Sequence, residues 1–106
     1  MSNIEERNKL IGDLINFDFF GDNDCNVLGF HNNWGLLVLA IKHINQNYPV
    51  IIEMSWSLAF IFRAVYLGKN KGDNAISFHA DPNEKDDILA AFNAIVELIK
   101  HINNND

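Results

Sequence analysis

Residues 81–103 read DPNEKDDILAAFNAIVELIKHIN, and this stretch predicts a long helix that buries one face. Asp81 is the expected N-cap, Pro82 the first helical residue, and Glu84 the partner of Asp81 in a capping box. Apolar residues then recur every three or four positions, which is the period of an amphipathic helix. They are Ile88, Leu89, Phe92, Ile95, Val96, Ile99 and Ile102. This helix therefore needs another layer to pack against.

A shorter amphipathic helix is expected near the N-terminus. It runs for about four turns, from a capping box of Ser2 and Glu5 to about Asn16. Its apolar side consists of Ile4, Ile11, Leu14 and Ile15. Residues 17–26 then predict a loop pinned by phenylalanines, and residues 27–31 predict a short extended piece.

A third helix is expected over residues 34–47, after Asn32 and Asn33, either of which can cap it. It is apolar almost all round, with leucine, isoleucine and valine on several sides. A helix with this pattern is expected to be buried on more than one face.

Three strands are expected after Pro49, at residues 50–56, 58–67 and 74–80. The first alternates apolar and polar residues, as a half-buried antiparallel strand does. The second does not alternate, and Arg63 is its only charged residue, so both of its faces need cover. Arg63 is expected either to pair with Glu53 across the first hairpin or to project into a partner.

These elements predict a single domain, residues 1–106, of the α+β class. We expect a small antiparallel sheet of three or four strands with about three helices packed on one face, a two-layer sandwich. The apolar excess on the second strand and on the helix before it indicates a homodimer or a partner-binding surface. The alternative is a well-covered central strand in a monomer.

The charge balance bears on the kind of partner. The formal net charge is -6, from 14 acidic and 8 basic residues, and the basic residues are scattered along the chain. Direct binding to nucleic acid is disfavoured, because that affinity comes from clustered positive charge. A basic protein surface is the more plausible partner.

The single cysteine, Cys25, cannot form a disulfide within the chain, which favours a cytoplasmic location. No apolar run is long enough to span a bilayer, so no membrane partner is expected.

Known catalytic and metal-binding patterns do not fit the sequence. Asp22, Asp24 and Asn26 match the first three ligands of a calcium loop, but Val27 and Asn33 stand where a glycine and a bidentate glutamate are required. The four histidines lack the paired spacing of a zinc site. We therefore expect no metal, no cofactor and no catalytic residues.

Two readings of function remain open. The leading one is a non-enzymatic binder in which acidic residues contact a basic partner and Trp56 and Arg63 act as anchors. The acidic candidates are Asp22, Asp24, Asp73, Asp86 and Asp87, and each can equally belong to a solvated face. The rival is a small homodimeric domain with a ligand pocket or weak hydrolytic activity built around Cys25 and His31. A virion accessory protein is a third alternative.

Two stretches resemble small phage and prophage proteins of Bacteroidetes. Residues 30–44, FHNNWGLLVLAIKHI, are similar to their aromatic-His-x-Ser-Trp-x-Trp-Leu-Met-Pro segment, with Asn33, Leu36 and Leu39 in place of its Ser, second Trp and Pro. Residues 88–100 resemble their closing Ala-Val-Tyr-x-Ala-Val-Val-Glu-Phe-Ile-Lys helix. The two matches cover about a quarter of the chain.

The resemblance implies a phage-borne accessory protein that binds a host protein, with no catalytic residues to carry over. Small acidic phage proteins are often inhibitors of host defence, including anti-CRISPR proteins. The setting that the resemblance suggests is inhibition of the RNA-guided nuclease of type VI systems.

Overall fold

The computed structural model describes residues 4–15, 29–56, 59–68 and 75–104. In this part of the chain, three helices and three strands follow one another in the order α1, α2, β1, β2, β3, α3. The helices are α1 (Ile4–Ile15), α2 (Trp34–Asn47) and α3 (Asp87–Asn104), and the strands are β1 (Val50–Ser55), β2 (Ile61–Tyr66) and β3 (Ile76–His79). The predicted order of two helices, three strands and a closing helix is therefore confirmed, but the short strand that was expected between the first two helices does not occur in the described residues.

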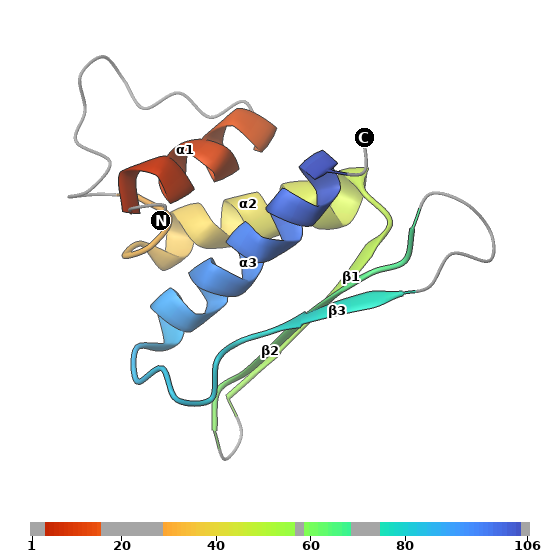
Figure 1. Cartoon of the computed structure of the whole chain (residues 1–106). Coiled ribbons are helices and arrows are strands. Elements are labelled where there is room, and N and C mark those ends of the chain that lie inside the picture. The colour runs from red at the N-terminus through yellow and green to blue at the C-terminus, as the bar shows by residue number, and fades with distance from the viewer. Residues whose placement is uncertain (1–3, 16–28, 57–58, 69–74, 105–106) are drawn as a thin grey trace.

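All three helices lie on one side of an antiparallel sheet whose strand order is β1-β2-β3 (Figure 1). Helix α3 packs on β2 and β3, and α2 packs on β1. Helix α1 packs on α2 and α3, on their side away from the sheet. The expected α+β class, with the helices packed on one face of a small antiparallel sheet, is confirmed.

Helix α3 forms the centre of the core. Ten of its 18 residues are buried, on the side toward the sheet and on the side toward the other helices. Its three buried alanines, Ala90, Ala91 and Ala94, let neighbouring elements approach closely. The expectation of a single buried face was therefore too narrow.

The start of α3 differs from the prediction: the helix begins at Asp87 rather than beside Asp81. The Glu84 N–H donates to the Asp81 carbonyl oxygen at 3.1 Å, which closes a β-turn with Pro82 in its second position. The Asp81 carboxylate accepts from the Asn83 N–H at 2.9 Å. Asp81 thus stabilises a local turn instead of the helix, because Asp-Pro-Asn suits a turn as well as a helix start.

The sheet register places the side chains of β2 alternately inward and outward. Phe62, Ala64 and Tyr66 are buried against the helices. Arg63 faces the other way, between Glu53 of β1 and His79 of β3. All three strands are shorter than predicted, because their expected ends fall in connections or outside the described residues.

The buried side chain of Asn8 holds α1 to the turn before α2. Its Oδ1 accepts from the Phe30 N–H at 2.8 Å, and its Nδ2 lies 2.9 Å from His31 Nδ1, to which it donates. Gly29 is packed so closely against this amide that an added Cβ would lie 2.7 Å from Asn8 Nδ2 and Oδ1. Residues 29–32 form a turn, in which the Asn32 N–H donates to the Gly29 carbonyl oxygen at 3.4 Å, and not the extended piece that was expected.

The two asparagines that were candidate caps of α2 have separate roles. Asn33 is the N-cap, and its Oδ1 accepts from the Leu36 N–H at 3.2 Å, which confirms one of the two predicted caps. The side chain of Asn32 instead accepts from the Gly29 N–H at 3.0 Å, within the turn.

We expect Gly29→Ala to lower the free energy of unfolding by about 1–3 kcal/mol, because the new methyl group displaces the Asn8 amide from its buried partners. In an Asn8→Ala background the same change should lower it by much less, since the clash is gone. Urea unfolding of the four proteins of this double-mutant cycle measures the coupling. Lys9→Ala is the control, because its pair with Glu5 at 3.2 Å is exposed and should contribute at most about 1 kcal/mol. Equal effects of Gly29→Ala in both backgrounds would contradict this account.

Candidate binding surfaces

The structure places four of the seven predicted contact residues on two separate surfaces. Trp56, Asp86 and Asp87 lie at one end of the molecule, and Arg63 lies on the sheet. The other three predicted residues, Asp22, Asp24 and Asp73, fall outside the described residues.

The first surface contains three aromatic rings packed against one another. The ring centroids of Trp34 and Trp56 are 5.4 Å apart, those of Trp34 and Phe60 5.9 Å, and those of Trp56 and Phe60 5.2 Å. Trp34 and Phe60 also pack against the core, whereas Trp56 is 53% exposed. The core thus holds one side of the cluster and leaves the Trp56 ring open to a partner.

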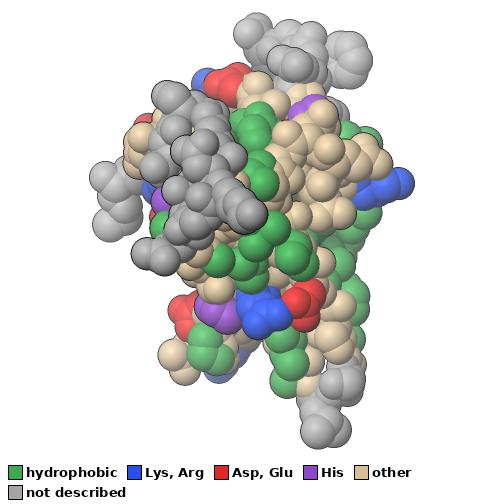
Figure 2. Space-filling view, turned by 90° about the vertical axis from the view of Figure 1, so that its right-hand side faces the viewer, with side chains coloured by type: hydrophobic (Ala, Val, Ile, Leu, Met, Phe, Trp, Pro, Cys, Tyr) green, Lys and Arg blue, Asp and Glu red, His purple; other side chains and the backbone are tan. Residues whose placement is uncertain are grey.

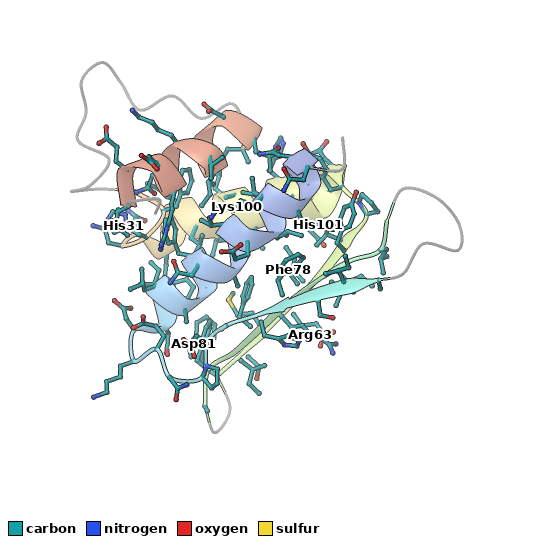
Figure 3. The ribbon with its side chains drawn as sticks, viewed as in Figure 1. His31, Arg63, Phe78, Asp81, Lys100 and His101 are labelled. Atoms are coloured by element: carbon teal, nitrogen blue, oxygen red, sulfur yellow. The ribbon has the colours of Figure 1, made fainter. Side chains whose placement is uncertain are left out.

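The connection from β3 to α3 brings carboxylates to the same end of the molecule. The Ala80 N–H donates to the Phe62 carbonyl oxygen at 3.0 Å, which fixes the start of this connection beside β2. Figure 1 shows that this connection and the β1–β2 hairpin turn lie at the same end, and Figure 3 shows Asp81 there. Residues 81–87 contain four carboxylates and one lysine. We call this region the acidic–aromatic end: Trp34, Trp56, Phe60, Asp81, Glu84, Asp86 and Asp87.

The carboxylates of this end differ in their contacts. Glu84 accepts from the Asp86 N–H at 3.2 Å, and Asp81 accepts within its own turn, so these two side chains also support the backbone. Asp86 is exposed and Asp87 half-buried at the N-terminus of α3, where the helix dipole favours negative charge. The end combines fixed negative charge with an exposed aromatic ring.

The second surface is the side of the sheet that faces away from the helices. Figure 3 shows Phe78 between the sheet and α3, with Arg63 on the opposite side of the sheet. Arg63 Nη2 donates to Glu53 Oε1, as expected from the sequence, and His79 is the neighbour of Arg63 on β3. We call this surface the outer sheet face: Ile51, Glu53, Ile61, Arg63, Val65, Leu67 and His79.

Apolar side chains surround the charged residues of the outer sheet face. Ile51 is 49% exposed, Ile61 56% and Leu67 42%, and no described helix or strand covers them. Figure 2 faces this side of the molecule and shows hydrophobic side chains on either side of a band of basic, acidic and histidine side chains. The sequence indicated that both faces of the second strand need cover, and the described residues cover only the inner one.

A third feature is an open hollow of about 410 Å³ along α2. Its lining is Gly35, Val38, Leu39, Lys42, His43 and Gln46. Val38 and Leu39 are exposed, so the expectation that this helix is buried on more than one side does not hold for them. Lys42, His43 and Gln46 supply the polar side chains of this lining.

The residues of the rival catalytic reading are only partly placed. Cys25 lies outside the described residues. His31 bonds to Asn8, and its ring packs edge-on against Phe92 with a centroid distance of 5.9 Å. This arrangement gives His31 a structural role in the turn before α2.

Two kinds of feature are absent from the described residues. Their histidine, aspartate and glutamate side chains do not gather in any group of three or more that could hold a metal ion. Among the described helices, none has the length and apolar character required to cross a bilayer.

Comparison with known proteins adds no relative. The chain matches no protein-family model, and neither curated proteins nor solved structures gave a match. Function is therefore argued from the surfaces themselves.

The sequence reading missed part of each surface. It did not place Asp81 and Glu84 beside the aromatic cluster, because it assigned them to the helix cap. It assigned Ile61 and Val65, together with Arg63, to one face of the second strand that needs cover, but it did not add Leu67, although Leu67 shares their parity.

We expect the two tryptophans to differ in their contribution to stability. Trp34→Ala should lower the free energy of unfolding by about 2–4 kcal/mol, because it leaves a gap against the core. Trp56→Ala should lower it by only about 1 kcal/mol, since it removes mainly the ring contacts of a half-exposed side chain. Thermal and urea unfolding of both variants measure the difference. Equal losses would show that Trp56 serves mainly the core.

Proposed function

We propose that this protein is a non-enzymatic binding protein that docks its acidic–aromatic end onto a basic surface of a bacterial host protein. The observation that carries this proposal is Trp56, a half-exposed ring packed against Trp34 and Phe60 at the same end of the molecule as a run of four carboxylates. Tryptophan is among the residues that most often dominate binding energy at protein interfaces.

The two parts of this end have complementary effects on binding. Carboxylates concentrated on one surface attract a positively charged partner at long range and raise the rate of association. An aromatic ring that is already held in place loses little side-chain entropy when it is buried, so it slows dissociation. Together they favour a partner with a basic surface and an apolar recess.

The class of partner that we propose is a nucleic-acid-handling effector of antiviral defence. Such proteins carry basic channels that neutralise phosphates, and an acidic protein can compete for those channels. The resemblance of residues 30–44 and 88–100 to phage-borne proteins supports an anti-CRISPR-like inhibitor. The RNA-guided nuclease of type VI systems is the first effector to test.

The test compares binding of the purified protein to a purified type VI nuclease, and to proteins retained from lysate of a Bacteroidetes host. Trp56→Ala should weaken binding about tenfold or more, as expected for an interface hot spot. The Asp86→Asn, Asp87→Asn double variant should slow association and reduce its salt dependence, because asparagine retains the capping ability of aspartate without its charge.

The matched control is the Asp13→Asn, Glu97→Gln double variant, which changes the net charge equally at exposed positions on α1 and on the later turns of α3. Its binding should resemble that of the wild type. If both double variants weakened binding equally, the net charge of the protein, and not the position of Asp86 and Asp87, would determine the affinity. Retention of no host protein at low salt, together with no binding to the nuclease, would overturn the proposal.

A further inference from the structure

We propose that the outer sheet face is the interface of a two-fold symmetric homodimer, in which Glu53 and Arg63 of each copy pair with Arg63 and Glu53 of the other. This inference concerns a different surface from the acidic–aromatic end and does not depend on the proposed function. Three properties of the face lead to it: its apolar side chains, its charge and the order of residues across its strands.

The apolar side chains are too extensive for an ordinary solvated sheet face. Ile51, Ile61 and Leu67 are each two-fifths or more exposed, and Val65 lies beside Ile51 across β1 and β2. Antiparallel sheets that face water normally alternate apolar residues inward with polar residues outward. Exposed aliphatic residues clustered on one face instead mark an interaction surface, and arginine is among the residues enriched at protein interfaces.

The charge of this face singles out a second copy as its occupant. The chain is strongly acidic, yet the described part of the outer sheet face holds one acid and one arginine. The other described carboxylates lie on α1, on α3 and in the connection before α3. These carboxylates are Glu5, Glu6, Asp13, Asp81, Glu84, Asp86, Asp87 and Glu97. Two acidic molecules can therefore meet at this face without bringing their excess negative charge together.

The order of residues makes the face complementary to itself. Glu53 and Arg63 are direct cross-strand neighbours at the middle of the β1–β2 pair, with Ile51 and Val65 forming the next pair but one. A two-fold axis that runs along the strand direction in the interface, midway between Glu53 and Arg63, places Glu53 of one copy opposite Arg63 of the other. It brings Ile51 opposite Val65 on one side of the pair and Ile61 opposite Ser55 on the other side. The exposed pair then becomes a four-residue network shielded from water, where a charge left without its partner is more costly than at a surface.

The size of the outer sheet face determines how tightly we expect the dimer to associate. Three strands about 4.8 Å apart and about six residues long at 3.3 Å each give a patch of roughly 14 by 20 Å. This is smaller than the standard interface of about 800 Å² per partner. We therefore expect a dimer whose dissociation constant lies in the micromolar range and whose population depends on concentration.

The test uses charge reversal of each member of the pair. Glu53→Arg leaves two arginines on each face, and Arg63→Glu leaves two glutamates, so each single variant should repel its own copy. We expect a dissociation constant at least tenfold above that of the wild type for each, measured by sedimentation equilibrium over a range of concentrations. An equimolar mixture of the two variants should form a heterodimer, because every arginine then faces a glutamate. Native mass spectrometry separates the two chains by mass and identifies that heterodimer.

Folding of the variants is checked by circular dichroism, and the Glu53→Arg, Arg63→Glu double variant covers the case in which a single variant fails to fold. The double variant keeps the pair within each copy and should dimerise like the wild type. A wild-type protein that stays monomeric at millimolar concentration would overturn the proposal and leave the face to a different protein. Dimerisation of the single variants with wild-type strength, or a mixture that forms no heterodimer, would also overturn it.

Discussion

Burial of α3 on two sides is the constraint on which the rest of the structure depends. The helix lies between the sheet and the other two helices, so its side chains contribute to both contacts of the core. Phe92, Ile95, Leu98 and Ile99 are fully buried, and the three buried alanines of the same helix keep the packing close. At about 25 cal/mol per Å² of apolar surface, this helix contributes more hydrophobic stabilisation than any edge strand can. Helix α3 positions the elements that pack on it, and the surfaces that do not face it remain for binding.

Much of the fold could be predicted because its strongest signals are local. The spacing of apolar residues located all three helices, and alternation located β1 and its pairing with β2 through Glu53 and Arg63. The start of α3 could not be predicted, because Asp-Pro-Asn satisfies the rules for a helix cap and for a turn. Only tertiary placement decides between them: the connection must return from Ala80, bonded to Phe62, before the helix can begin at Asp87.

The binding surfaces were less predictable, because they depend on which residues meet in space. The sequence identified Trp56, Arg63, Asp86 and Asp87 one by one, and the fold divides them between two surfaces. The sequence does not give the solvent exposure of each side chain. The sequence pattern of an apolar strand residue does not depend on whether another element covers that residue. A helix covers Phe62, whereas no described element covers Ile61. The turn around Asn8 was also beyond the reach of periodicity, since it joins residues 22 positions apart through a single buried amide.

The placement of α1 has a consequence for how the molecule opens. This helix does not contact the sheet, and it is joined to the rest by its apolar side, by Asn8 and by the bond from Arg7 Nη1 to Asn93 Oδ1 at 2.7 Å. Such an element can detach while the sheet and α3 remain folded, so native-state hydrogen exchange should divide the protein into two cooperative units. Amide protons of α1 would then exchange through partial opening, and those at the centre of α3 only through global unfolding. The small fold would thus hold two levels of stability.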